Sequence, residues 1–521
     1  MHIELQLILT PEQAFKEDLF SKQIADKLQI SPKQITRIRT LKKSIDSRSF
    51  IPKVIVTVEV YWDEVAPEAV IPPFEYHFVG DNTPVLIIGA GPAGLFAALK
   101  LIESGFKPII LERGKNTSDR KIDIAQLNRN KGIDSNSNYC FGEGGAGTFS
   151  DGKLYSRSKK KGNTQRIFEA FHFHGANDDI LYEAHPHIGS DKLPTIISNI
   201  SNTIITNGGE IHFDQKLTEI LIENNAVVGC KTADGSIFKA NSLILCTGHS
   251  AHDIYELLDK QGIQLEPKGF AMGVRVEHSQ SLIDSIQYHS KTRSEYLPAA
   301  NYNLVDQIND RGVYSFCMCP GGHIVPAGSG DNEIVVNGMS VSKRNSPFAN
   351  SGIVVEIRPE DIPEEYQKFG ALAGLKFQQS IENMAFKNNG GQGQVAPAQR
   401  LVDFVHGKLS ADLPECSYLP GLISSPLHFW LPENISSRLQ EGFKKFDRKM
   451  HGFLTNAAVV VGVETRSSAA VRVPRDSETG QHPVLSGLFP AGEGSGYSGG
   501  ITSSAVDGEN AAINAAKWMN G

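Results

Sequence analysis

The chain has 521 residues, of which 40% are hydrophobic and 21% are charged, and its formal net charge at pH 7 is −7. A chain of this length is expected to form two to four domains of roughly 150 residues each, and its acidic balance gives no general reason to expect a nucleic-acid-binding protein. The sequence shows no signal-peptide pattern, no continuous apolar span and no paired cysteine framework, which predicts a cytoplasmic protein without membrane segments.

The first 78 residues are expected to form a small α+β module of the ferredoxin-like type, with the order strand, helix, strand, strand. IELQLILT and IPKVIVTVEVYW alternate as strands do, and residues 11–28 have helical spacing. Six basic residues in the middle of the module form either a docking patch for an anionic partner, such as RNA or an acidic protein, or a solvated basic face. They are Arg37, Arg39, Lys42, Lys43, Arg48 and Lys53.

The strongest signal in the chain is VLIIGAGPAGLFAALKLIESGFKPIILERG, which begins at Val85. A short apolar strand runs into a GxGxxG turn, an amphipathic helix and a second strand that ends in an acidic residue, which is the pattern of a dinucleotide-binding unit. The glycines allow a tight turn, close approach of a pyrophosphate and close packing of the helix on the strand, and the acid can accept hydrogen bonds from an adenosine ribose. The residues expected to contact the cofactor here are Gly89, Ala90, Gly91, Pro92, Ala93, Gly94, Glu112 and Arg113.

A second glycine-rich stretch, CFGEGGAGTFSDGKL, has no strand directly ahead of it and is therefore not a second fingerprint. Its backbone amides and hydroxyl groups suit contacts with a phosphate or with the edge of a ring. Further along, three short strands joined by tight turns predict a β-meander, and SLILCTG predicts a buried strand that ends in small residues. The cofactor contacts predicted in these segments are Gly144, Gly145, Thr148, Ser150, Leu217, Thr247 and Gly248.

Together with GLFPAGEGSGYSGGI near the end of the chain, these segments resemble FAD-binding proteins of the glutathione-reductase-like class. More narrowly, CFGEGGAGTFSDGKL, HPHIGSDKL, FCMCPGGHIVPA, NGMSVSKRN and GVETRSSAAVRVPRD resemble a bacterial family of uncharacterised FAD-dependent dehydrogenases, over nearly the whole chain. The resemblance implies an α/β fold with a Rossmann-like FAD-binding domain, a parallel sheet and a β-meander. It also implies an inserted α+β domain that covers the flavin and builds the substrate pocket.

The resemblance explains the glycines of AGEGSGYSGGITSSAVDG, because a flavin ring would have to touch the backbone there and side chains would be in its way. The resemblance places Glu493, which follows Gly492, near the ribityl or pyrophosphate part of FAD. It places Gly499, Gly500 and Ile501 against the flavin. The helix that begins there would direct its positive end at the ring edge, which becomes negative on reduction.

The predicted domains are the N-terminal module (1–78), the first part of the FAD-binding domain (79–265), the inserted domain (266–453) and the completion of the FAD-binding domain (454–521). Three candidates for chemistry are charged or titratable. His187 is either a general acid/base or a histidine hydrogen-bonded in a proline turn. Arg275 and Arg466 either anchor a carboxylate or an anionic flavin, or form internal ion pairs with Glu277 or Glu464.

Cys317 and Cys319 lie two residues apart on a predicted strand, so their side chains are expected on one face. Three interpretations are open. Cys317 and Cys319 could be redox-active thiols near the flavin, metal ligands together with His323, or buried structural cysteines. No fourth ligand stands at a recognisable spacing, so no metal is expected.

The sequence as a whole predicts an FAD-dependent oxidoreductase that transfers hydride between the flavin and a small organic substrate. No second strand–GxGxxG–helix unit is present, so NADH or NADPH, as an external electron donor, would have to bind in the shared pocket. The alternatives are a flavin-dependent RNA-modifying enzyme that docks through the basic module and a non-catalytic flavin-binding regulator. The substrate and the oligomeric state are not indicated.

Overall fold

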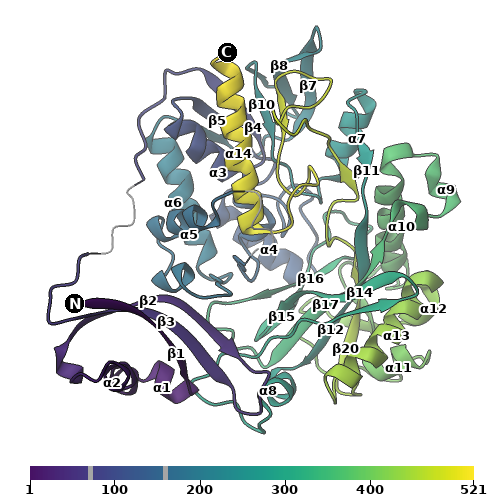
Figure 1. Ribbon diagram of the computed structural model, residues 1–521. Coiled ribbons are helices and arrows are strands. Elements are labelled where there is room, and N and C mark those ends of the chain that lie inside the picture. Colours follow the sequence, from purple (N-terminus) through teal and green to yellow (C-terminus); the bar gives the residue numbers. More distant parts are fainter. Residues whose placement is uncertain (69–73, 156–161) are drawn as a thin grey trace.

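The computed structural model describes residues 1–68, 74–155 and 162–521. Figure 1 shows three regions: the N-terminal module in purple, a region around a parallel sheet that contains the C-terminal helix in yellow, and a region around a larger sheet in green. Within the described ranges, none of the helices combines the length and the apolarity that crossing a bilayer requires.

The N-terminal module is an antiparallel three-stranded sheet whose strands are ordered β1-β3-β2, with two short helices packed on one face. Alternate valines of β3 are fully buried against these helices, as the sequence pattern predicts. The helix predicted over 11–28 is broken at Lys16, whose backbone is extended. The module has the predicted order of strand, helix, strand and strand. In its described part, no helix and no fourth strand follow β3, and a ferredoxin-like unit would need both. Its elements are β1 (His2–Leu9), α1 (Pro11–Phe15), α2 (Glu17–Leu28), β2 (Ile35–Asp46) and β3 (Lys53–Trp62).

Three of the six basic residues of this module are engaged in ion pairs. Arg39 lies 2.7 Å from Glu59, Arg48 lies 2.6 Å from Asp46, and Lys43 lies 2.9 Å from Glu183 in the neighbouring region. These pairs leave less uncompensated positive charge for an anionic partner than the sequence alone suggests.

The second region is built on a five-stranded sheet of order β22-β10-β4-β5-β6, in which every neighbouring pair is parallel. Parallel strands buried on both faces are continuously apolar, which is why VLII and LIL carry no polar alternation. The strands are β4 (Pro84–Ile88), β5 (Lys107–Leu111), β6 (Glu210–His212), β10 (Leu243–Leu245) and β22 (Leu488–Pro490).

Helices cover one face of this sheet, and a meander with one helix covers the other. Ile87 packs with the helices, whereas its neighbours Leu86 and Ile88 pack with the meander, because successive side chains of a strand point to opposite faces. The C-terminal helix α14 lies along α3 (Figure 1), at a crossing so close that a β-carbon on Gly508 would clash with the carbonyl of Ala93. The covering elements are α3 (Pro92–Glu103), α5 (Thr164–Phe173), α6 (Leu193–Thr206) and α14 (Ile501–Met519) on one face, and β7 (Leu217–Glu223), β8 (Ala226–Thr232), β9 (Ile237–Lys239) and α7 (His252–Lys260) on the other.

The third region is a mixed seven-stranded sheet of order β13-β14-β17-β12-β20-β18-β19, packed against helices that contribute to the largest apolar core. Strand β20 lies beyond residue 453, so this sheet extends past the predicted end of the inserted segment, and the parallel sheet resumes only at β22. The strands are β12 (Phe270–Ser279), β13 (Val305–Ile308), β14 (Arg311–Cys319), β17 (Phe348–Ile357), β18 (Ala396–Arg400), β19 (Leu422–Ser424) and β20 (Val459–Glu464). The helices are α8 (Gln280–Tyr288), α10 (Ala373–Lys387), α11 (Leu401–Val405), α12 (Leu427–Trp430) and α13 (Glu433–Lys449).

The remaining elements connect these regions. Two small antiparallel pairs, β11 with β21 and β15 with β16, lie beside the seven-stranded sheet. Their bounds, with those of the two remaining helices, are β11 (Glu266–Pro267), β15 (Gly322–Pro326), β16 (Val336–Ser340), β21 (Val471–Arg472), α4 (Thr117–Asn128) and α9 (Glu364–Gln367).

Candidate functional site

A cavity of about 710 Å³ lies where the carboxyl ends of β4, β5 and β10 meet strand β14 of the large sheet and strand β16 of the small antiparallel pair beside it. This is the edge at which open α/β sheets bind their ligands, because loops rather than helices follow the strands there. The residues predicted to contact the cofactor that do line it are Gly89, Gly91, Pro92, Ala93, Glu112, Arg113, Gly145, Ser150, Leu217, Thr247, Gly248, Glu493, Gly499, Gly500 and Ile501.

The three glycines of the fingerprint differ in what surrounds them. Gly89 has a φ of +103°, and a β-carbon there would lie 2.9 Å from the carbonyl oxygen of Cys246. A β-carbon on Gly94 would clash with the carbonyl oxygen of Gly89. Gly91 has an ordinary φ of −75°, and its nearest neighbour would be Gly145 Cα at 3.9 Å. Two glycines are therefore required by the chain itself, and the third opens onto the cavity.

A second group of uncrowded glycines lines the cavity after β10 and at the start of α14. β-Carbons on Gly248, Gly499 and Gly500 would have no atom of the chain within 4 Å. Gly500 has a φ of +144° and is the residue from which α14 begins. A long helix that starts at an uncrowded backbone presents its unpaired N–H groups to whatever binds beside it. These two groups of glycines fit a dinucleotide cofactor whose pyrophosphate and ring approach the backbone closely.

Glu112 ties the segments of the cavity together. Its carboxylate is 5% exposed and accepts hydrogen bonds from the backbone N–H groups of Ala90 at 2.8 Å, Gly142 at 2.9 Å and Gly114 at 3.0 Å. The side chain lines the cavity, but both of its oxygens already accept hydrogen bonds from the chain. Its contact with an adenosine ribose stays a prediction.

Arg120, on α4, fixes the glycine-rich loop and has no counterpart among the predicted site residues. Its guanidinium donates hydrogen bonds to the carbonyl oxygens of Asn138, Glu143 and Gly145, each at 2.8 Å, and the side chain is fully buried. Burial lowers the pKa of Arg120 to about 10, with nearby carboxylates opposing the shift. The helix that carries it shows no glycine signature, so the sequence gives no local signal for this role.

Five predicted cofactor contacts do not line the cavity in the described part of the chain, and their contact with a cofactor stays a prediction. The Thr148 hydroxyl donates to the Glu143 carbonyl at 2.7 Å and is fully buried, so it offers no group to a ligand. A β-carbon on Gly144 would clash with that hydroxyl, and the Gly492 amide donates to Asp507 at 2.8 Å. The five residues are Ala90, Gly94, Gly144, Thr148 and Gly492.

Of the four candidates for catalysis, only Arg466 lines the cavity in the described residues. Its guanidinium lies 2.8 Å from Glu382 and 2.7 Å from Glu333, two partners that were not anticipated. Burial raises the pKa of Glu382, and the Arg466 charge opposes that shift. With both partners in place, Arg466 is held rigidly rather than left free to bind an anion.

The other three candidates lie behind the cavity wall. Arg275 is fully buried and pairs with Glu464 at 2.8 Å, which confirms the predicted ion pair. His187 Nε2 lies 3.1 Å from the Ser342 carbonyl oxygen, and burial and the Arg344 charge lower its pKa, which favours the alternative of a hydrogen-bonded structural histidine. Cys319 is fully buried. None of these three side chains lines the cavity, so the geometry gives no support for direct contact with a substrate.

Strands β14 and β16 and the glycine-rich loop present a different set of side chains to the cavity. Tyr314, Phe316 and Cys317 come from β14, Asn337 comes from β16, and Lys153 comes from the glycine-rich loop. Lys153 stands in the DGKL motif, but nothing in its local sequence shows that it meets β14. Contacts between the inserted region and the dinucleotide-binding sheet form only when the whole chain folds. The local sequence therefore does not predict which side chains of β14 and β16 line the cavity.

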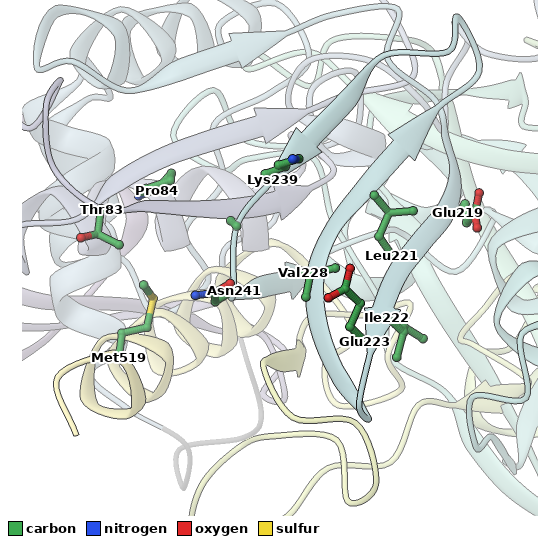
Figure 2. A pocket seen from close by; sticks show the side chains of 11 residues that line it. Thr83, Pro84, Glu219, Leu221, Ile222, Glu223, Val228, Lys239, Asn241 and Met519 are labelled. Atoms are coloured by element: carbon green, nitrogen blue, oxygen red, sulfur yellow. The ribbon is translucent and has the colours of Figure 1, made fainter.

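A second hollow of about 590 Å³ lies at the far end of the parallel sheet, between the meander and the last turn of α14. Figure 2 shows Met519 and Asn241 on one side and Val228, Ile222 and Glu223 on the other. It contains no histidine or cysteine and only Lys239 as a basic side chain among its described lining residues, and it lies away from the fingerprint.

Comparison with known proteins adds the identity of the family. An uncharacterized protein of Clostridium beijerinckii (strain ATCC 51743 / NCIMB 8052) is 37% identical over 513 residues, which cover 94% of each chain. The chain belongs to the same protein family as this relative. Residues 269–467 match the domain described as FAD-dependent protein, C-terminal domain-like, residues 82–128 match an FAD-binding domain, and residues 1–61 match a domain of unknown function. The family member described here is an FAD-binding flavoprotein, and the predicted FAD cofactor is confirmed.

Solved structures that resemble this flavoprotein are distant. Glycine oxidase from Bacillus cereus ATCC 14579 is 13% identical, covering 83% of this chain and 94% of that chain at a TM-score of 0.34. A flavoprotein/dehydrogenase from Cytophaga hutchinsonii is 11% identical, covering 84% and 79% at a TM-score of 0.36. Likenesses at this level carry no argument about substrate or reaction. The glutathione-reductase-like class, the substrate and the nicotinamide donor stay predictions.

Proposed function

We propose that the protein is an FAD-dependent oxidoreductase that reduces a small organic substrate in the cavity between the parallel sheet and β14, with NADH or NADPH as the electron donor. The observation that carries the proposal is that one cavity joins the uncrowded glycines of a dinucleotide site to the side chains of a second sheet. A cofactor on one wall therefore faces room for a substrate on the other.

Residues on the first wall would hold FAD. Gly91 and the start of α3 suit the pyrophosphate, Arg113 and Leu217 lie at the end of the cavity suited to the adenosine, and Glu493 suits the ribityl chain. When bound, FAD supplies reversible two-electron chemistry. The backbone at Gly499 and Gly500 leaves space for its ring.

The chain's own contribution to reactivity is electrostatic. The 19-residue helix α14 begins at the cavity, and a helix N-terminus stabilises neighbouring negative charge by about 0.3–2 kcal/mol depending on exposure. Tyr314 and Phe316 line the cavity from β14, and their aromatic rings would limit the access of water to that wall. Asn337 is held in place because its side-chain oxygen accepts from the Gly338 N–H at 2.7 Å.

The donor would use the same cavity. The sequence has one dinucleotide fingerprint, and that fingerprint is assigned to FAD. NAD(P)H and the organic substrate are therefore expected to take turns, with the reduced cofactor carrying electrons between them.

An anaerobic acceptor screen tests the organic-substrate part of the proposal. The bound flavin is reduced photochemically, and small organic compounds are added one at a time while the flavin absorbance is followed. At least one compound is expected to restore the oxidised spectrum. Recovery of the spectrum with oxygen alone, and with no organic compound, would favour a non-catalytic flavin-binding regulator.

A further inference from the structure

Cys317 is brought to the cavity by an irregularity in its strand. The pairing of β14 with β17 shifts register between Phe316 and Cys319, so that an extra residue is accommodated, and Cys317 takes a φ of +48°. A left-handed backbone is unfavourable for a cysteine, and β-bulges of this kind redirect side chains at functional sites. The result is that Cys317 lines the cavity while Cys319 is fully buried behind it.

Two cations surround the pair. Cys319 Sγ lies 3.8 Å from Lys153 Nζ and 3.6 Å from Arg275 Nη2. Arg275 also donates to the Cys317 carbonyl oxygen at 2.8 Å, and Lys153 donates to the carbonyl oxygen of Met318. The Cys319 thiol itself lies 3.3 Å from the Cys317 carbonyl oxygen. These contacts hold the Cys319 sulfur within 4 Å of two cations, behind the cavity wall that Cys317 lines.

That environment separates the two thiols in acidity. Hydrogen bonding with the Cys319 side chain, and then the charges of Lys153 and Arg275, lower the pKa of Cys317 to about 5 against the effect of burial. The pKa of Cys319 is raised by the same hydrogen bond and by burial. The charged groups that face the pair from the surrounding segments are Lys153, Arg275, Asp151, Glu464 and Arg344.

We propose that Cys317 and Cys319 form a redox-active dithiol and that the substrate reduced in this cavity is a small disulfide. The inference deepens the proposed function and rests on it for the supply of electrons. Cys317 is the attacking thiol because it reaches the cavity, and Cys319 is the resolving thiol because it lies directly behind. Attack on a carbon electrophile needs only one nucleophilic thiol. Reduction of a disulfide by thiol–disulfide exchange needs a second thiol, and β14 provides one in Cys319.

The exchange balances within the chain and the substrate. The Cys317 thiolate attacks one substrate sulfur, the substrate S–S bond breaks, and the first thiolate leaves and takes the proton of Cys319. The Cys319 sulfur then attacks Cys317, forming the Cys317–Cys319 disulfide and releasing the second thiolate, which takes a proton from water. The substrate gains two electrons, and the cysteine pair loses them. NADH or NADPH, acting through the bound cofactor, is the reductant that restores the dithiol.

A chromogenic disulfide tests this directly. The FAD-loaded protein is reduced, desalted and mixed anaerobically with dithiodipyridine at pH 6. In the wild type, the pair is expected to release two thiones rapidly, and the peptide that contains both cysteines is expected to lose two hydrogens with no retained label. Cys319→Ser should release one thione and keep the label on Cys317, and Cys317→Ser should lose the rapid phase by tenfold or more.

Cys140 is the matched control, because it also lines the cavity but its thiol donates to the Ala327 carbonyl oxygen at 3.4 Å, away from the pair. Cys140→Ser should keep the rapid release of both thiones. A wild-type protein that keeps a stable label on Cys317, or a Cys317→Ser variant that reacts as fast as the wild type, would overturn the inference.

The pH profile of alkylation gives a second readout. A thiol whose pKa is lowered is thiolate in a larger fraction at pH 6 than free cysteine is, so Cys317 should react with iodoacetamide faster than N-acetylcysteine at pH 6, and its rate should rise much less than that of N-acetylcysteine from pH 6 to pH 8. A rate that rises tenfold per pH unit over this range would contradict it. Neither thiol assay needs turnover of the flavin, so a failure of electron delivery from NAD(P)H is seen separately.

Discussion

Gly91→Ala adds a methyl group that should leave the stability of the folded chain unchanged and weaken the binding of FAD. The backbone of Gly91 has a φ of −75°, which any residue adopts, and the new methyl carbon would lie no closer than 3.9 Å to another atom of the chain. The space it enters is the cavity beside the first turn of α3. The unfolding temperature of the apoprotein should therefore be unchanged, and FAD affinity should fall.

The size of the loss follows from the contacts displaced. A methyl group at this point moves the pyrophosphate away from the N–H groups of the helix start, and a hydrogen bond to a charged group contributes about 1.5–3 kcal/mol. Loss of one such bond, about 1.5–3 kcal/mol, corresponds to FAD binding that is roughly 10- to 150-fold weaker.

The assay is equilibrium titration of apoprotein with FAD, followed by quenching of flavin fluorescence, with thermal unfolding of the same apoprotein samples. Gly94→Ala is the contrasting variant, because its methyl group would clash with the carbonyl oxygen of Gly89 within the chain. It should destabilise the apoprotein by about 1–3 kcal/mol or more. If Gly91→Ala binds FAD as the wild type does, or unfolds as early as Gly94→Ala, the reasoning about this turn is refuted.

Three further predictions concern stability. Gly508→Ala, whose methyl group meets the Ala93 carbonyl, should destabilise the α3–α14 contact by about 1–3 kcal/mol in urea unfolding, and an unchanged midpoint would contradict that packing. Arg466→Met leaves Glu382 and Glu333 buried without their cation and should cost about 3–5 kcal/mol by the same measurement, whereas a cost below about 1 kcal/mol would show that the pair is not buried as described. Burial raises the pKa of Asp151, but the charges of Lys153 and Arg344 outweigh this effect and lower the pKa to about 2. The pKa of an unfolded aspartate is about 3.9, so between these two values the folded carboxyl is ionised while the unfolded one is protonated. This contributes about 2.5 kcal/mol above roughly pH 4 that is lost as the pH falls toward 2, so Asp151→Asn should be less stable by about that amount at pH 7 and less pH-dependent below pH 4, and parallel pH curves would contradict it.

The sequence predicts the dinucleotide half of the site because its signals are local. Strand, turn and helix around Gly91 are specified within about 20 residues, and each glycine has a mechanical reason that can be stated without a partner. The helix that begins after Gly500 is likewise predicted by its local sequence, which is apolar and has helical spacing. At Thr148 the sequence does not distinguish a hydroxyl that turns toward a ligand from one that turns toward the loop's own carbonyl, which is the orientation in the structure.

The second half of the site depends on pairings between distant segments. Glu382 and Glu333, the partners of Arg466, stand 84 and 133 residues away from it in the chain. The assignment of β20 to the large sheet likewise rests on its pairing with β12, nearly two hundred residues earlier. For Cys317, a regular strand would place both thiols on one face, and only the bulge against β17 separates one at the cavity from one behind it.

The central claim, that this cavity is a redox site supplied by a nicotinamide, is tested most directly by an anaerobic titration of the FAD-loaded protein with NADH and then with NADPH. The flavin absorbance is followed, and dithionite gives the fully reduced reference. The account predicts that one of the two nicotinamides bleaches the flavin at one equivalent per bound FAD. A flavin that stays oxidised with both nicotinamides and is bleached only by dithionite would contradict it.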